Sequence, residues 1–407
     1  MTIAVGKSIK LKTENVMLSD RAKNISPFIV MDVLERAAEL ERQGKPIIHL
    51  EVGEPDFDVP EAVPAATQQA FSEGRSHYTH SLGDPELRHQ IAKKYLQEYN
   101  VKVSAERIIV TSGSSPALLM AMGALCNTGD EVILSDPGYA CYPNFIQFIG
   151  ARAVKVPVYE EDGFQFQPEE ICKRITKRTR AILINSPMNP TGNLLSADVM
   201  KQLSHYDVPV ISDEIYHGLV YEGRAHSMLE FSENAFVVNG FSKLYAMTGL
   251  RLGYMIAPAG YVRSIQKFQQ NLFICASSVA QRAAIAALKY SEDHIKKMKE
   301  TYNARRIYMV ERLRQMGFNI KSVPTGAFYV FVNASHIWKN SYELAFDILE
   351  KAHVGVAPGI DFGQNGEGYL RFSYANSIEN IEEGLCRLER YFQTIKHGET
   401  KHLINPH

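Results

Sequence analysis

The chain has 407 residues, and at roughly 150 residues per domain this length predicts two or three domains. It carries 44 lysines and arginines against 45 aspartates and glutamates, so its net charge is -1. This near balance argues against a nucleic-acid backbone or an anionic membrane as its main partner.

The cysteines exclude two classes of small module. There are five of them, an odd number, and no pair has C-x-x-C spacing, so neither a disulfide framework nor a common zinc module fits. We therefore expect no metal site and a reducing, cytoplasmic location. The stretch Met1 to Lys12 contains lysines but no apolar core, so we expect no secretory signal.

The middle of the chain alternates short, apolar β-branched runs with helical segments. Alternation of this kind predicts an α/β domain with a mostly parallel seven-stranded sheet covered by helices. The uncharged stretch 108–129 fits a strand, a loop and a buried helix better than a membrane span. The seven predicted strands are 107–111, 131–134, 153–158, 181–184, 208–212, 236–238 and 252–256.

Both ends of the chain predict a second, smaller α+β domain. A long helical pattern from 261 to 315 leads to two apolar strands with helices between and after them. An N-terminal helix at 28–43 is expected to pack with this domain. We expect the following division: an N-terminal segment at 1–50, a large domain at 51–290, a small domain at 291–395 and a polar tail at 396–407.

Parallel sheets bind ligands beyond the carboxyl ends of their strands, so the loops there are the first candidates for a site. The first predicted strand leads into Gly113, Ser114, Ser115 and Pro116. Serine and proline suit the start of a helix, and the free N–H groups and hydroxyls there suit a phosphate group. Taken alone, this motif is explained better by a plain helix cap without a ligand.

Two further strand ends carry polar side chains. Asn189 lies in an Asn-Pro-Thr-Gly turn after the fourth strand, and Asp213 directly follows the fifth. A tight turn and a helix cap would explain them without any function. In the functional alternative, Asn189 presents its amide rigidly, and Asp213 pairs with a cation or a protonated ring nitrogen because a buried carboxylate needs such a partner.

Three basic residues stand near strands in the second half of the chain. Lys243 follows the sixth strand among small residues, where it is either a snorkelling surface lysine or an amine nucleophile. Arg251, eight residues on, can hold an anion with its planar fork. Arg371 lies within a strand pattern, where it either faces solvent from an edge strand or binds a carboxylate ligand.

Together these segments resemble the fold-type I, pyridoxal-phosphate-dependent aminotransferases of class I/II, close to the bacterial aspartate/aromatic group. They occur in the order typical of that family and cover about residues 25–390, so the ordered set is specific although each fragment is weak. The matching segments are 52–57, 78–83, 85–88, 111–118, 189–192, 212–216, 242–243, 247–254 and 371–374.

The resemblance implies the transferase fold of these enzymes and a role for each residue around pyridoxal 5'-phosphate. Lys243 would hold the cofactor as an internal aldimine, and Asp213 would keep its pyridine nitrogen protonated, which makes the ring an electron sink. Tyr216 and Asn189 would hydrogen-bond the 3-hydroxyl oxygen of the ring. Tyr139 would stack on the ring.

The resemblance also implies how the phosphate is held. Ser114, Ser115 and Arg251 would bind it, and Tyr78 would reach it from the neighbouring subunit, which implies a homodimer. This chain departs from the family at Gly240, three residues before the lysine, where a serine or threonine often contacts the phosphate.

The implied function is ping-pong transamination between an L-amino acid and a 2-oxo acid, commonly 2-oxoglutarate. Arg371 would clamp the substrate α-carboxylate with help from the Gly53 backbone, and the freed Lys243 amine would move the Cα proton. Serine at 115, where some aspartate-specific relatives carry lysine, weakens an aspartate-only interpretation. Phe28, Tyr139 and Phe273 are candidates for contacting an aromatic or aliphatic side chain.

Alternatives from other classes stay open. The same scaffold supports β-elimination of cysteine conjugates, which yields pyruvate and ammonia without an oxo-acid acceptor. A cofactor-binding regulatory protein would need an N-terminal DNA-binding module, and the family motifs at 52–57 begin too early for one. A nucleotide-binding protein is disfavoured because neither G-x-G-x-x-G nor G-x-x-x-x-G-K-[ST] is present.

Overall fold

The computed structural model describes residues 17–402, with side chains described as far as residue 395. Residues 1–16 and 403–407 lie outside the described residues. They include the N-terminal stretch that we expected not to be a signal, and the end of the expected tail.

The large sheet has seven strands in the order β2-β8-β7-β6-β5-β3-β4. Only β8 runs against the others, since it pairs antiparallel with both β2 and β7, whereas β3 to β7 pair in parallel. The predicted mostly parallel, seven-stranded α/β fold is therefore confirmed. The strands are β2 (Ile108–Thr111), β3 (Glu131–Asp136), β4 (Arg152–Pro157), β5 (Thr179–Asn185), β6 (Val210–Asp213), β7 (Phe236–Gly240) and β8 (Gly253–Ile256).

Both faces of this sheet are buried, which explains why its strands are apolar throughout. In β2, Ile108 and Val110 belong to one core cluster and Ile109 to another, because successive side chains of a strand point to opposite faces. Helix α5 (Ser114–Leu125) packs against β7 and β8 on one side. The uncharged stretch that contains it is thus a strand and a buried helix, as predicted.

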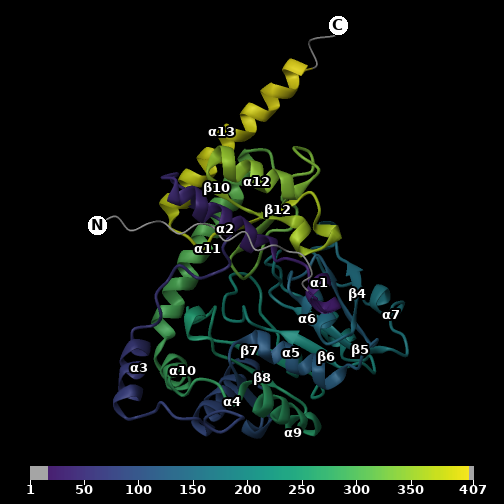
Figure 1. Cartoon of the computed structure of the whole chain (residues 1–407), viewed down its shortest axis with the longest axis vertical. Coiled ribbons are helices and arrows are strands. Elements are labelled where there is room, and N and C mark those ends of the chain that lie inside the picture. The colour runs from purple at the N-terminus through teal and green to yellow at the C-terminus, as the bar shows by residue number, and fades with distance from the viewer. Residues whose placement is uncertain (1–16, 403–407) are drawn as a thin grey trace.

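A smaller unit lies above the large sheet (Figure 1). It has an antiparallel sheet in the order β11-β12-β9 and a parallel pair of β1 with β10. Helix α2 packs against α12, β10 and β11, so segments from both chain ends meet here. The elements are α2 (Ile29–Arg42), β1 (Ile48–His49), β9 (Tyr329–Asn333), α12 (Ser341–Ala352), β10 (Val354–Gly355), β11 (Ala357–Pro358), β12 (Tyr369–Ser373) and α13 (Ile378–His402).

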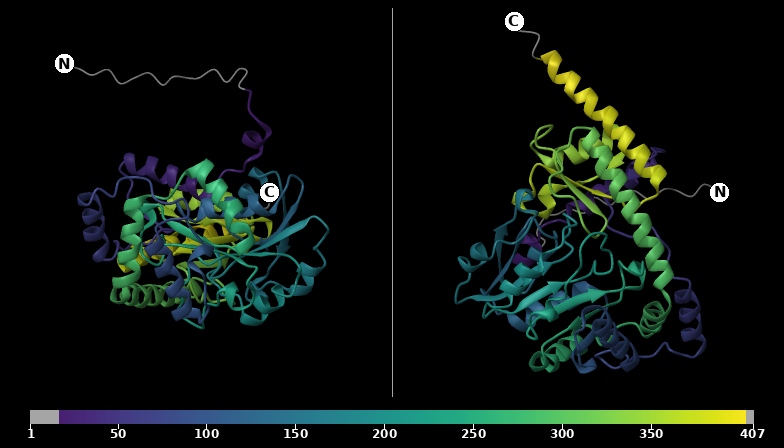
Figure 2. Two further views of the ribbon diagram at one scale, coloured as in Figure 1. Left: turned by 90° about the horizontal axis from the view of Figure 1, so that it is seen from below. Right: turned by 180° about the vertical axis from the view of Figure 1, so that it is seen from behind.

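The long helical region predicted from 261 to 315 is broken in the structure. Its last helix, α11 (Glu292–Gln315), runs along one side of the molecule from the large unit to the small one, as Figure 2 shows. The break follows a π-helical turn at Gln269–Phe273, where Ile274 takes a positive φ of 66° and Ser277 caps the next helix through its side chain. At the C-terminus, α13 continues to His402, beyond the expected start of the tail at residue 396.

Three of the remaining helices connect strands of the large sheet: α6 (Tyr142–Phe148), α7 (Pro168–Cys172) and α8 (Ala197–Leu203). Helices α1 (Asp20–Asn24), α3 (Ala62–Ser72) and α4 (Pro85–Tyr99) precede its first strand in the chain, and α9 (Ala259–Phe268) and α10 (Ser278–Tyr290) follow its last.

Candidate active site

A cavity of about 380 Å³ lies where the carboxyl ends of β5, β6 and β7 face the small sheet. This volume is in the range of cavities that hold small-molecule ligands. Of the eleven residues proposed from the sequence, only Tyr78 lies outside its lining, and its side chain is 80% exposed. The residues brought together are Gly53, Ser114, Ser115, Tyr139, Asn189, Asp213, Tyr216, Lys243, Arg251 and Arg371.

Lys243 is held three residues beyond the end of β7, with its amine inside the cavity. Its Nζ donates a hydrogen bond of 2.6 Å to the carbonyl oxygen of Gly53. Burial is the largest of the effects that lower the pKa of this amine to about 8; Arg371 and Arg251 add to it, whereas Glu54 and Asp213 oppose it. An amine inside the cavity that loses its proton near pH 8 is suited to act as a nucleophile or base, so the snorkelling alternative is wrong.

Asp213 is the last residue of β6 and is 4% exposed. Its Oδ2 accepts a hydrogen bond of 2.7 Å from the Tyr142 hydroxyl, and its Oδ1 accepts one of 3.2 Å from the Ile215 backbone N–H. Burial raises the pKa of this carboxyl to about 6, although both hydrogen bonds oppose that rise. A buried carboxylate of this kind gains most from a cationic partner such as a protonated ring nitrogen.

The start of α5 forms an anion site at one end of the cavity. Its first-turn amides have no acceptor within the helix, and Ser114 and Ser115 line the cavity beside them. Gly113, with a positive φ of 96°, lies so close to Arg251 that a Cβ there would come within 2.8 Å of Nη2. The glycine thus brings the guanidinium to the helix N-terminus, and together they favour a phosphate group.

Gly240, where relatives often carry a hydroxyl, has little room for a side chain. A Cβ at this position would lie 3.1 Å from the Leu252 carbonyl oxygen, 3.2 Å from the Gly253 Cα and 3.2 Å from the Ile215 Cδ1. Glycine in place of the family's serine or threonine therefore fits the close approach of β7 and β8 at this position. Ser242, which lines the cavity, is the nearby hydroxyl in sequence.

Arg371 lies on β12, which is the central strand of the small sheet, and it is 2% exposed. The surface, edge-strand alternative for this residue is therefore wrong. Its Nη1 donates to Asn189 Oδ1 at 2.9 Å, and its Nη2 donates to the Glu51 carbonyl oxygen at 2.5 Å. Its Nε is buried without a partner in the described structure. The guanidinium lines the cavity, and its planar charge suits a carboxylate ligand.

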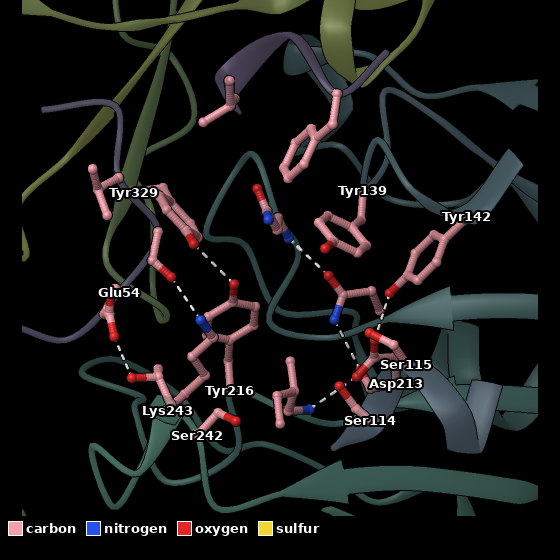
Figure 3. A pocket seen from close by; sticks show the side chains of 18 of the residues that line it. Glu54, Ser114, Ser115, Tyr139, Tyr142, Asp213, Tyr216, Ser242, Lys243 and Tyr329 are labelled. Carbon is pink, nitrogen blue, oxygen red and sulfur yellow. Dashed lines mark hydrogen bonds between the residues drawn. The ribbon is translucent and has the colours of Figure 1, made fainter. Parts of the chain in front are cut away.

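Figure 3 shows two tyrosines that sequence reasoning missed. Tyr142 points at Asp213, and the Tyr329 hydroxyl meets the Tyr216 hydroxyl at 2.9 Å. Tyr142 stands three residues after Tyr139, as the first residue of α6, and this proximity in sequence is the only signal for it. Tyr329 lies in a strand of apolar residues, and nothing in the pattern distinguishes it.

Of the three aromatic residues expected to contact a substrate side chain, two line the cavity and one does not. Phe28 and Tyr139 line the cavity, and their rings meet edge to face with centroids 6.1 Å apart. Phe273 does not line it and packs beside the core around α5 instead.

Comparisons with known proteins agree with this geometry. The family "Aminotransferase class I and II" matches residues 45–388. The chain belongs to the class I and II aminotransferases. These enzymes use pyridoxal phosphate, and the chain is a pyridoxal-phosphate-dependent aminotransferase that catalyses transamination. The lyase and regulatory alternatives are not favoured by any of the relatives described below.

Three proteins illustrate the similarity. A (5-formylfuran-3-yl)methyl phosphate transaminase from Methanocaldococcus jannaschii is 42% identical over 92% of this chain and 99% of its own. An aspartate aminotransferase from Pyrococcus horikoshii is 38% identical over 93% and 96%. The crystal structure of aspartate aminotransferase from Thermus thermophilus with maleate is 36% identical, with a TM-score of 0.88, over 92% of this chain and 100% of that one.

The residues present fit pyridoxal phosphate. The buried amine of Lys243 suits covalent attachment, the buried Asp213 carboxylate suits a ring nitrogen, and the α5 N-terminus with Arg251 suits the phosphate. The guanidinium of Arg371 in the cavity lining suits the substrate carboxylate. Within residues 17–402, no helix is long and apolar enough to cross a membrane.

Proposed function

We propose that this chain carries out ping-pong transamination between an L-amino acid and a 2-oxo acid, with 2-oxoglutarate as the expected acceptor. The observation that carries the proposal is the presence in one cavity of a buried amine of low pKa, a buried carboxylate and a guanidinium. These are the side chains of Lys243, Asp213 and Arg371.

The cofactor ring would be held from three sides. Asp213 would pair with the ring nitrogen, and Tyr139 would stack on the ring. Asn189 and Tyr216 would donate to the ring oxygen. Because Oδ1 of Asn189 already accepts from Arg371, its two amide N–H groups remain to donate, which supports this role.

The phosphate would be bound by the α5 amides, Ser114, Ser115 and Arg251, with Tyr78 contributed by a second copy of the chain. The exposed Tyr78 ring, which lies outside the cavity of its own chain, supports a homodimer in which each subunit completes the site of the other. A phenol at a phosphate adds one neutral donor to the cationic and backbone donors.

When bound, the cofactor supplies an electron sink that stabilises negative charge at the substrate Cα. Arg371 orients the substrate through its α-carboxylate, so that the Cα–H bond faces Lys243. Once displaced from the cofactor by the substrate amine, the Lys243 amine would remove the Cα proton as a general base and, as an ammonium, would deliver it to the C4′ carbon of the cofactor as a general acid. The pKa of about 8 favours both roles, because proton transfer is fastest when the pKa of the group is near the working pH.

The cavity favours uncharged substrate side chains over aspartate. One wall of the cavity is apolar. It is formed by α2 and the residue that precedes this helix, with the side chains of Phe28, Val30, Met31 and Leu34. The cationic side chains in the lining, which are Lys243, Arg251 and Arg371, already have roles. A partner for the distal carboxylate of 2-oxoglutarate would then come from the second subunit.

The remaining expectations are proposals as well. The contacts of α2 with α12, β10 and β11 support the expected packing of the N-terminal segment, through α2, with a small domain at 291–395 beside a large domain at 51–290. The five free cysteines support a cytoplasmic location.

The test is a panel of L-amino acids with the purified, cofactor-loaded enzyme, with 2-oxoglutarate or pyruvate as acceptor. We expect faster turnover of aromatic and aliphatic amino acids than of aspartate, and loss of turnover in Lys243→Ala. The matched control is Lys173→Ala, which removes an exposed lysine paired with Glu170. Pyruvate and ammonia formed from a cysteine conjugate without any acceptor would overturn the proposal in favour of β-elimination.

A further inference from the structure

The guanidinium of Arg371 lies between two aromatic rings. Its Cζ is 4.3 Å from the ring centroid of Tyr329 on β9 and 4.9 Å from that of Phe362, which ends the 3-10 helix Gly359–Phe362. Both aromatic side chains are buried, being 1% and 3% exposed. Attraction between a cation and an aromatic face is strongest in such a desolvated setting, so the two rings restrain the plane of the guanidinium.

Tyr329 also reaches the opposite side of the cavity through its hydroxyl. That hydroxyl lies 2.9 Å from the Tyr216 hydroxyl, and a Cβ built on Gly53 would come within 2.4 Å of it. Gly53 in turn accepts the hydrogen bond from Lys243. The Tyr329 side chain therefore contacts both Arg371 and Tyr216. It also lies against Gly53, whose carbonyl oxygen accepts the hydrogen bond from Lys243.

We propose that Tyr329 is a positioning residue with two separable actions: its ring orients Arg371 for the substrate carboxylate, and its hydroxyl strengthens Tyr216 as a donor to the cofactor ring oxygen. The inference rests on the proposed function, since it takes the roles of Arg371 and Tyr216 from there. Phe362 shares the first action but lacks a hydroxyl, so it cannot share the second.

The direction of the hydroxyl pair follows from the acceptor beyond it. An ionised ring oxygen can only accept from Tyr216, so the Tyr216 proton would point into the cavity and Tyr329 would donate to the Tyr216 oxygen. Burial raises the pKa of both phenols, which keeps both protons in place at neutral pH. Hydrogen bonds in such a chain strengthen one another by about 10–30%. The other titratable groups that face the pair are Arg371 and Tyr139.

The experiment uses the cofactor-loaded enzyme and two readouts besides turnover. The first is the dissociation constant of 3-phenylpropionate, a carboxylate without an amine, which reports on Arg371. The second is the midpoint pH of the change in cofactor absorbance, which reports on donors to the ring oxygen. The variants are Tyr329→Phe, Tyr329→Leu and Phe362→Leu. The matched control is Tyr391→Phe, which removes a buried hydroxyl bonded to Asp347 on α12.

We expect the three variants to separate the two actions. Tyr329→Phe keeps the ring, so inhibitor affinity stays within about twofold while the midpoint pH rises by roughly 0.3 unit, because a weaker donor stabilises the ring oxyanion less. Phe362→Leu weakens inhibitor binding by about tenfold and leaves the midpoint unchanged. Tyr329→Leu shows both effects, and Tyr391→Phe shows neither.

Two outcomes would overturn the inference. If Tyr329→Phe leaves the midpoint where Tyr391→Phe leaves it, the hydroxyl has no effect on Tyr216. If Phe362→Leu binds 3-phenylpropionate as tightly as the wild type, the rings do not orient Arg371. Should Tyr329→Leu fail to fold, these two milder variants still decide the matter. Failure of the proposed function is distinct, since Arg371→Gln would then also leave inhibitor binding unchanged.

Discussion

The Tyr142 hydroxyl donates a hydrogen bond of 2.7 Å to the Asp213 carboxylate from the first turn of α6. Burial raises the pKa of Asp213 to about 6, and this hydrogen bond opposes the rise by favouring the charged form. Tyr142 is thus the group that helps a buried carboxylate to stay ionised at neutral pH.

Replacing Tyr142 with phenylalanine is expected to weaken cofactor binding by about tenfold at pH 7, since a hydrogen bond to a charged group contributes about 1.5–3 kcal/mol. In the wild type, affinity for pyridoxal phosphate should fall as the pH drops through about 6, where Asp213 becomes neutral. In Tyr142→Phe this fall should begin at a higher pH, because the pKa of Asp213 rises. Titrating the apoenzyme with pyridoxal phosphate between pH 5 and 8.5 measures the affinity and its dependence on pH for the wild type and the variant. If the affinity of Tyr142→Phe falls at the same pH as that of the wild type, the role given to Tyr142 is contradicted.

The low pKa of Lys243 predicts a pH dependence for cofactor loading. Below about pH 8 the side chain is mainly an ammonium and cannot attack the cofactor aldehyde, whereas above it the free amine predominates. The rate of covalent loading of the apoenzyme, followed by absorbance, should therefore rise with pH and reach half its maximum near 8. Lys173→Ala should show the same profile, and a half-maximum near the ordinary lysine value would refute the role given to burial.

Restoring the hydroxyl of the family at Gly240 is expected to destabilise the protein. Because a Cβ there lies within 3.2 Å of backbone atoms of β8, Gly240→Ser should lower the free energy of unfolding by about 1–3 kcal/mol. Affinity for pyridoxal phosphate should not improve. Gly260→Ser is the matched control, since nothing lies within 4 Å of a Cβ at that position. If Gly240→Ser is stable and binds the cofactor more tightly, close packing does not explain the glycine at this position.

The close approach of Arg251 to Gly113 can be tested separately from backbone strain. Gly113→Ala adds a methyl group 2.8 Å from Nη2 of Arg251, at a φ of 96°. Gly129→Ala imposes a similar strain at a φ of 85°, but nothing lies within 4 Å of its Cβ. Both should be less stable by about 1 kcal/mol or more, while only Gly113→Ala should weaken cofactor binding, by about tenfold. Equal cofactor affinities in the two variants would argue against an anion site at α5.

Mixed dimers test whether Tyr78 acts on the site of a second subunit. Lys243→Ala should be inactive, and Tyr78→Ala should bind the cofactor several-fold more weakly, at about the cost of one hydrogen bond to a charged group. In a mixed dimer, the subunit that keeps Lys243 receives Tyr78 from the Lys243→Ala subunit, so one complete site forms. Co-expression should therefore restore activity above that of Tyr78→Ala alone, measured at limiting cofactor. Unchanged activity, or a monomer by size-exclusion chromatography, would refute the arrangement.

The strand ends show how far local patterns reach. Lys243, Asp213 and Asn189 were recognisable because each follows an apolar run, and the carboxyl ends of parallel strands meet at one edge of a sheet. The order of family motifs added the cofactor and the reaction, because each motif keeps its place relative to these strands.

Other features depended on long-range packing. The break at Ile274 was hidden inside a continuous helical pattern, since a positive φ at one residue leaves no periodic signal. In the sequence, Gly240 stands where the family often has a hydroxyl, and only the structure shows that a side chain there would make tight contacts with the backbone of Leu252 and Gly253.

The sequence by itself determined the alternating α/β pattern, the residues at the strand ends and the chemistry that those residue types support. It could do so because hydrophobic periodicity and strand-end chemistry are local properties of the chain. Only the tertiary structure decided that Tyr142 reaches Asp213 and that Tyr329 links Arg371 to Tyr216. Those partners lie 71, 42 and 113 residues apart, and contacts over such distances are set by how helices and sheets pack, not by the pattern of either segment.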